Sequence, residues 1–162
     1  MKVASKTLLA SYLLILLWLV LLKTSLDVSS VLDYQMRSLN LIPFVGASQG
    51  NTREMVDNLI VFIPLGLLLG VNFKRANFWR KLAFIFFFSL AAEVIQFALA
   101  IGTTDITDVI MNTSGGLLGL LIYDLTSKYV DSEKLNRCIV VVITVLLVAL
   151  LLLRLLVLRV RY

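Results

Sequence analysis

Residues 82–101 read LAFIFFFSLAAEVIQFALAI, an apolar run that only a few polar residues interrupt. At a rise of 1.5 Å per residue, a helix of this length crosses about 30 Å of hydrocarbon. Lipid favours the helix because every backbone N–H and C=O group then has a partner inside the segment. The run therefore predicts a transmembrane helix, and Glu93 and Gln96 are polar residues within it that require an explanation.

Four further apolar runs occur in the 162 residues, which are 60% hydrophobic and 15% charged. A soluble domain of this size does not have that balance. We expect an all-α fold, a polytopic transmembrane helical bundle of five spans (four at minimum) that forms a single domain over residues 1–162 in the cell membrane. The predicted spans are residues 7–22, 57–73, 82–101, 106–123 and 139–158.

The first and last runs are expected to be anchor helices. Residues 7–22 follow two lysines, as the apolar part of a signal peptide does, but no small-residue cleavage site comes after them, so we expect a retained anchor. Residues 139–158 contain or precede Arg154, Arg159 and Arg161. Two interpretations of this segment stay open, a full fifth span and a re-entrant or surface-lying segment.

Lysine and arginine residues predict the orientation, because short cytoplasmic loops carry an excess of them. The N-terminus and two connections that fall on one side carry nine of these residues: Lys2, Lys6, Lys74, Arg75, Arg80, Lys81, Lys128, Lys134 and Arg137. The long loop on the other side has Lys23, Arg37 and Arg53, offset by acids. The N-terminus is therefore predicted to be cytoplasmic. The net charge of +5 is interpreted as topology and not as nucleic-acid binding.

The composition also limits the possible chemistry. The chain has one cysteine, Cys138, and no histidine. One cysteine excludes a disulfide or a cysteine-based metal site within the chain. Without histidine, the usual general base at neutral pH and the commonest metal ligand are missing. We expect no metal and no cofactor, so any chemistry uses carboxylates, amides and hydroxyls.

Polar residues gather at the outer end of three predicted spans, although an acid near the centre of a span costs about 2.5–3.5 kcal/mol. Glu93 lies roughly 12 Å below the outer end of its span, and Gln96 shares its helix face. The candidate residues are Asn58 on the second span, Glu93 and Gln96 on the third, and Asp105, Asp108 and Asn112 at i, i+3 and i+7 on the fourth. We interpret them as the lining of an outward-facing polar cavity.

Each candidate also has a purely structural interpretation. Asp105 and Asp108 fit an N-cap and a first-turn acid, and the amides fit hydrogen bonds between helices. Glu93, as a buried acid, is either protonated or paired with a basic residue of the outer loop such as Arg37 or Arg53.

Small residues predict where the helices approach most closely. The patterns Gly66-x-x-x-Gly70 and Gly115-x-x-x-Gly119 favour tight helix contacts. We expect these contacts below the polar residues, where they would close the floor of the cavity.

Several ordered motifs occur over residues 37–120: Asn40-Leu41-Ile42-Pro43-Phe44, Asn58-Leu59-Ile60-Val61-Phe62-Ile63-Pro64-Leu65-Gly66, Glu93-x-x-Gln96 and Asp105-x-x-Asp108-x-x-x-Asn112-Thr113-x-Gly115. Together they resemble the VanZ-like membrane proteins. Many relatives carry an arginine shortly before the first aspartate of the last motif, where this chain has Thr103 and Thr104. The family is associated with resistance to teicoplanin and related lipoglycopeptide antibiotics in Gram-positive bacteria, so the resemblance implies a role at the cell envelope.

Two functions follow as hypotheses. In the first, the cavity binds or shields an amphiphile, either a lipoglycopeptide antibiotic or a lipid-linked peptidoglycan precursor, among membrane lipids. Its ligand-binding residues are Asn40, Pro43, Asn58, Glu93, Gln96, Asp105, Asp108 and Asn112, with the Pro43 loop as a lid. In the second, Glu93 and an ionised Asp105 or Asp108 act as an acid and base on a lipid-linked precursor, with or without a cation such as Mg²⁺. A purely structural role of the polar layer is a third reading, and the oligomeric state is open.

Overall fold

The computed structural model describes residues 2–21, 38–44, 52–100 and 103–160. The helices are α1 (Lys2–Leu21), α3 (Thr52–Asn72), α4 (Phe78–Leu99), α5 (Ile106–Thr126) and α6 (Ser132–Val160), and the strands are β1 (Ser38–Asn40) and β2 (Thr103–Asp105). All five helices are long and apolar enough to cross a membrane. The predicted five-span helical fold is therefore confirmed.

Four of the five helices begin before the apolar runs that predicted them, and α5 begins at Ile106 as predicted. Asn77 caps α4 by accepting a hydrogen bond from the Trp79 N–H at 3.3 Å. Asp131 accepts from the N–H groups of Glu133 and Lys134 at 3.0 Å, so α6 starts at Ser132 and not at Ile139. A hydropathy pattern misses such first turns because their residues are polar, whereas a capping side chain determines where the helix starts.

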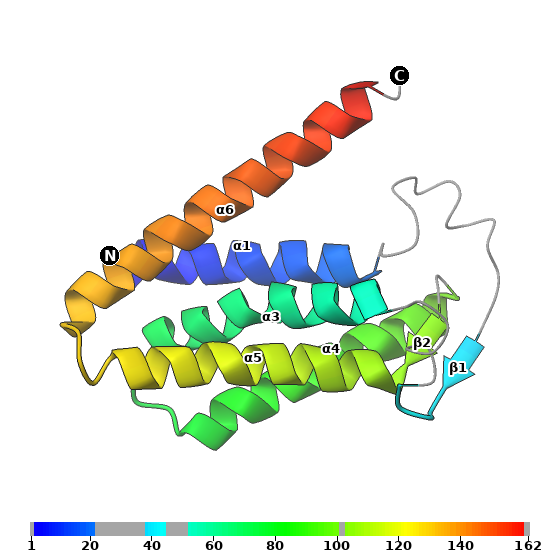
Figure 1. Ribbon diagram of the computed structural model, residues 1–162, viewed down its shortest axis with the longest axis horizontal. Coiled ribbons are helices and arrows are strands. Elements are labelled where there is room, and N and C mark those ends of the chain that lie inside the picture. Colours follow the sequence, from blue (N-terminus) through cyan, green and yellow to red (C-terminus); the bar gives the residue numbers. More distant parts are fainter. Residues whose placement is uncertain (1, 22–37, 45–51, 101–102, 161–162) are drawn as a thin grey trace.

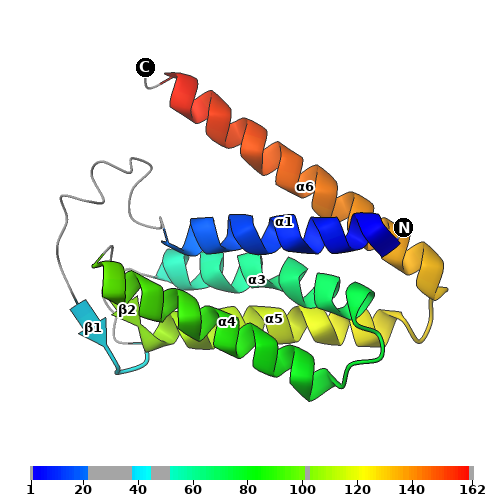
Figure 2. The same cartoon turned by 180° about the vertical axis from the view of Figure 1, so that it is seen from behind.

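Helices α1, α3, α4 and α5 lie side by side, and α6 leaves this bundle at an angle (Figures 1 and 2). One end of the bundle carries the N-terminus and the connections at residues 73–77 and 127–131, and we call it the turn end. The other end carries β1 and β2, and we call it the sheet end. Helices α3 and α5 both start at the sheet end and run parallel to each other.

Helix α6 is one unbroken helix from Ser132 to Val160. This continuity supports the full fifth span and opposes the re-entrant interpretation, which requires the chain to reverse. The arginines that raised the question have side chains outside the described part of the chain.

A glycine seam joins α3 to α5. A Cβ atom on Gly66 would meet the carbonyl oxygen of Gly116 and the amide nitrogen of Leu120. A Cβ on Gly115 would meet the carbonyl oxygen of Leu59, and one on Gly119 that of Ile63. Backbone lies directly on backbone along this seam, as small-residue motifs allow. The predicted role of the glycines in close packing is confirmed.

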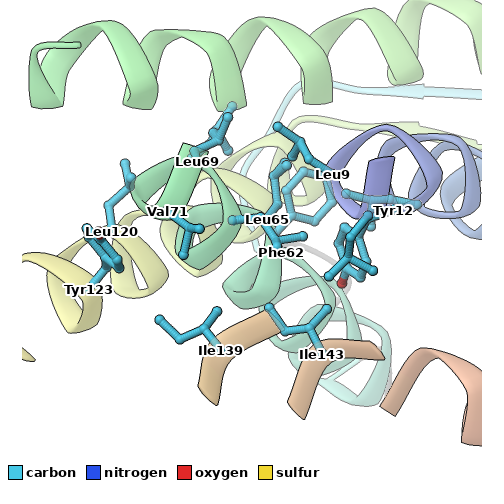
Figure 3. Packing of buried hydrophobic residues seen from close by; sticks show 14 of the residues in the cluster. Leu9, Tyr12, Phe62, Leu65, Leu69, Val71, Leu120, Tyr123, Ile139 and Ile143 are labelled. Carbon is cyan, nitrogen blue, oxygen red and sulfur yellow. The ribbon is translucent and has the colours of Figure 1, made fainter. Parts of the chain in front are cut away.

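The apolar core is centred on α3 and includes residues of all five helices. Figure 3 shows Phe62 and Leu65 of α3 in the middle of the cluster, and both are fully buried. Tyr12 of α1 also donates its hydroxyl proton to the Val61 carbonyl oxygen at 2.6 Å. Pro64 has no N–H to donate to the Ile60 carbonyl, which is next to Val61 in α3. The tyrosine therefore contacts α3 beside the position where proline weakens it.

The basic residues that predicted the orientation lie at the turn end, because their elements begin or end there (Figure 1). Lys81 is buried, although it belongs to this basic group. Its ammonium group lies 3.8 Å from the Asp124 carboxylate, which is 40% exposed. The grouping agrees with the expected pattern, and the cytoplasmic N-terminus stays a prediction.

Candidate functional site

The sheet end contains a short parallel sheet that the sequence did not predict. β1 pairs with β2 in the register Ser38↔Thr103, Leu39↔Thr104 and Asn40↔Asp105. The pairing brings Asn40 to Asp105, and the Asn40 amide donates to the Asp105 carboxylate at 3.0 Å. Two motifs that lie far apart in the sequence therefore meet through a strand pair.

Asp105 links three elements. Its carboxylate caps α5 by accepting from the Thr107 N–H at 2.7 Å, as the structural interpretation predicted. Its own N–H donates to Oε2 of Glu93 at 3.2 Å, which ties β2 to α4. Capping is therefore only part of what Asp105 does, since it also holds Asn40 and Glu93.

The predicted stripe on α5 divides between two neighbouring helices. Asp108 contacts α3, where its carboxylate accepts from the Asn58 amide at 2.5 Å. Asn112 contacts α4, where its Nδ2 donates to the Ser89 hydroxyl oxygen at 2.9 Å. All four side chains are buried. The spacing correctly placed these residues on the bundle side of α5, but it did not predict two different partners.

Glu93 and Gln96 are both buried, with 2% and 3% of their surfaces exposed. Gln96 donates through Nε2 to the Val20 carbonyl oxygen of α1 at 2.8 Å. The backbone carbonyl of Glu93 also accepts from the Thr104 hydroxyl at 3.3 Å. Of the two predicted ionic partners of Glu93, Arg37 lies outside the described residues and Arg53 is exposed at the start of α3.

The loop after β1 presents its apolar side chains outward. Leu41, Ile42, Pro43 and Phe44 are all exposed. The loop backbone is nevertheless held, because the Ile42 N–H donates to Asn40 Oδ1 at 3.2 Å and the Phe44 N–H donates to the Thr107 hydroxyl at 3.0 Å. A closed lid over a cavity stays a prediction.

Two residues of the site were missed by the sequence analysis. Ser89 lies one turn before Glu93 on the same face of α4, and this spacing was the available signal. Thr107 is fully enclosed at 1% exposure and holds the loop, but no pattern in the sequence singles it out.

Some buried acceptor atoms at this end have no hydrogen-bond partner among the described residues. They include Oε1 of Gln96 and Oδ1 of Asn112. The buried Thr113 hydroxyl oxygen also has no partner among the described residues. No group of three Asp, Glu or Cys side chains that would hold a metal ion occurs in the described ranges. The site is thus a set of hydrogen-bonding groups in which some acceptor atoms receive no hydrogen bond from the described residues.

Comparison with known proteins places the chain in a family. The family model described as VanZ/LLP1 matches residues 9–127. The chain is 55% identical over 141 residues to Protein VanZ of Enterococcus faecium, and the alignment covers 87% of this chain and 86% of that protein. No solved structure matches the chain significantly. The match includes every candidate site residue, and the chain belongs to the VanZ/LLP1 family.

Proposed function

We propose that the sheet end faces the outside of the cell and binds an amphiphile, a lipoglycopeptide antibiotic of the teicoplanin type or a lipid-linked peptidoglycan precursor. By binding this ligand, the protein confers resistance to such antibiotics. The family relationship supports the link to resistance. The motif residues include most of the buried polar groups of the sheet end, and this supports the choice of site.

One observation carries the proposal, namely that the buried polar side chains are concentrated where α3, α4, α5 and the sheet meet. Asn58, Glu93, Gln96, Asp108 and Asn112 are each less than a tenth exposed. Polar groups inside a membrane are costly and commonly mark a functional site. The exposed apolar loop at residues 41–44 lies beside them, so a ligand with a lipid tail and a polar head would meet both kinds of surface.

The proposal is tested by antibiotic susceptibility in a teicoplanin-sensitive Gram-positive host. Glu93→Gln keeps the volume of the side chain and an oxygen for the Asp105 N–H, but it removes the carboxylate. We expect this variant to lose most of the resistance that the wild-type protein confers. The matched control is Asp124→Asn at the turn end, which removes a carboxylate from the ion pair with Lys81 and should retain resistance.

Protein levels in the membrane are measured for both variants, because a variant that does not accumulate gives no resistance. Full resistance of a normally expressed Glu93→Gln variant would contradict the proposal.

A carboxylate-dependent enzyme is the alternative, and one contact favours it. The Glu93 carboxylate accepts from the Asp105 N–H at 3.2 Å, so two acidic residues lie on neighbouring elements of the sheet end, and acidic side chains can serve as acid and base. Conversion of a lipid-linked precursor by the purified protein, abolished in Glu93→Gln, would support this alternative. Resistance without any chemical change in antibiotic or precursor would support binding.

A further inference from the structure

The orientation of the Gln96 amide is determined by its partner. Val20 offers a backbone carbonyl oxygen, which only accepts, so the Gln96 atom 2.8 Å away is the amide nitrogen. Oε1 must then point away from Val20. This oxygen is buried and has no partner among the described residues.

Asn112 shows the same condition on the facing helix. Its Nδ2 donates to Ser89 at 2.9 Å, while Oδ1 is buried without a partner in the described part of the chain. Each amide therefore donates one hydrogen bond inside the protein, while its acceptor oxygen has no partner among the described residues. A buried acceptor that lacks a hydrogen bond costs about 1–3 kcal/mol, so two such oxygens indicate a position that something else completes.

The helix geometry places these groups along one line. Ser89, Glu93 and Gln96 follow each other at i, i+4 and i+7 on the buried face of α4. At 1.5 Å per residue they cover roughly 10 Å along the helix axis. Asn112 is joined to Ser89 at one end of the line, Glu93 in the middle contacts β2, and Gln96 at the other end contacts α1. We call Ser89, Glu93, Gln96 and Asn112 the acceptor line.

We propose that the acceptor line receives a hydrogen-bond-donating part of the ligand, a sugar hydroxyl group or an ammonium group, and rejects phosphate and carboxylate groups. The inference rests on the proposed function and adds the chemical class that is bound. A hydroxyl or ammonium donates to an amide oxygen, whereas a phosphate brings further acceptors against acceptors. An ionised Glu93 carboxylate would also repel an anion.

The test uses three amphiphiles that share a dodecyl chain and differ in the head group. Dodecylamine offers an ammonium, dodecyl glucoside offers hydroxyls, and dodecyl phosphate offers acceptors. The purified full-length protein is placed in phosphatidylcholine nanodiscs, and the rise in Tm is measured at equal ligand concentration, because a ligand that binds the folded state raises Tm. We expect a rise of several degrees with the amine or the glucoside and none with the phosphate.

Gln96→Met and Asn112→Leu remove the acceptor oxygens with little change in volume, and both should abolish the rise. Asn72→Leu is the matched control, because Asn72 lies at the turn end with its hydrogen bonds to Ser5 and Leu68. Each variant is compared with its own unliganded Tm, so a loss of stability alone does not imitate a loss of binding.

Three results would overturn the inference. An equal or larger rise with dodecyl phosphate would show that acceptor groups bind. A rise that persists in both Gln96→Met and Asn112→Leu would place the ligand elsewhere. If none of the three amphiphiles raises Tm, water alone completes the acceptors. In each case the susceptibility of the Glu93→Gln strain decides separately whether the proposed function stands.

Discussion

The glycine seam between α3 and α5 differs from the acceptor line on α4 and α5 in how its buried atoms are packed and paired. Along the seam, glycines at positions 66, 115 and 119 allow backbone to touch backbone, so any added atom meets a neighbour. Along the acceptor line, Gln96 and Asn112 are fully enclosed, yet each has an acceptor oxygen without a partner among the described residues. Close backbone contact along the seam stabilises the bundle, whereas an unpaired acceptor oxygen in the acceptor line costs stability. We propose that this difference separates a ligand site from helix packing.

The largest effect is expected in the seam, for Gly66→Ala. The added methyl group would overlap the backbone of Gly116 and Leu120, which cannot rotate away, so we expect a loss of at least about 3 kcal/mol of unfolding free energy. Gly70→Ala is the comparison variant, because its methyl group would meet side-chain atoms of Tyr123 and not backbone, so we expect a smaller loss. Thermal unfolding in nanodiscs measures both, and equal losses would contradict the backbone seam.

A smaller effect is expected where α6 packs on the bundle. Ile143 is 3% exposed and Val145 is 61% exposed on the same helix. Ile143→Ala should cost about 2 kcal/mol, the lower end of the usual range, because lipid and not water surrounds the helices when they separate. Val145→Ala should leave the unfolding free energy unchanged within error. If the two variants unfold alike, α6 does not pack as the structure indicates.

The Asn58–Asp108 hydrogen bond tests whether a polar contact of the sheet end also supports the bundle. In a double-mutant cycle with Asn58→Leu and Asp108→Leu, we expect a coupling energy of about 0.6 kcal/mol, the average for hydrogen bonds between membrane helices, and no more than about 1.7 kcal/mol. This contact would then belong with the seam. Additive single effects would mean that the two side chains do not stabilise each other.

The smallest effect is local and concerns the loop after β1. Thr107→Val removes the acceptor of the Phe44 N–H but keeps the shape of the side chain, so we expect faster hydrogen exchange at that amide and little change in overall stability. The control is Thr144→Val on α6, where the hydroxyl bonds to its own helix at Val140. Unchanged exchange at Phe44 would show that this hydrogen bond does not hold the loop.

The sequence predicted much of this molecule and missed specific parts of it. Apolar length identified all five helices, because lipid permits few other solutions for such runs. The strand pair was not predicted, since Asn40 and Asp105 lie 65 positions apart and three-residue strands leave no periodic signal. Spacing placed Asp108 and Asn112 toward the bundle, but a helix face contacts more than one neighbour. Only the assembled structure shows which helix each residue meets.

One pair of variants tests most directly whether the acceptor line serves a ligand and not the fold. Asn112→Leu and Asn72→Leu each remove one buried or half-buried amide, at the sheet end and at the turn end respectively. Teicoplanin resistance in cells and Tm of the purified protein are measured in parallel. We expect Asn112→Leu to lose resistance with an equal or higher Tm, because an unsatisfied acceptor is removed, and Asn72→Leu to lower Tm while retaining resistance per folded molecule. If Asn112→Leu retains resistance, or loses resistance and Tm together, the acceptor line belongs to helix packing.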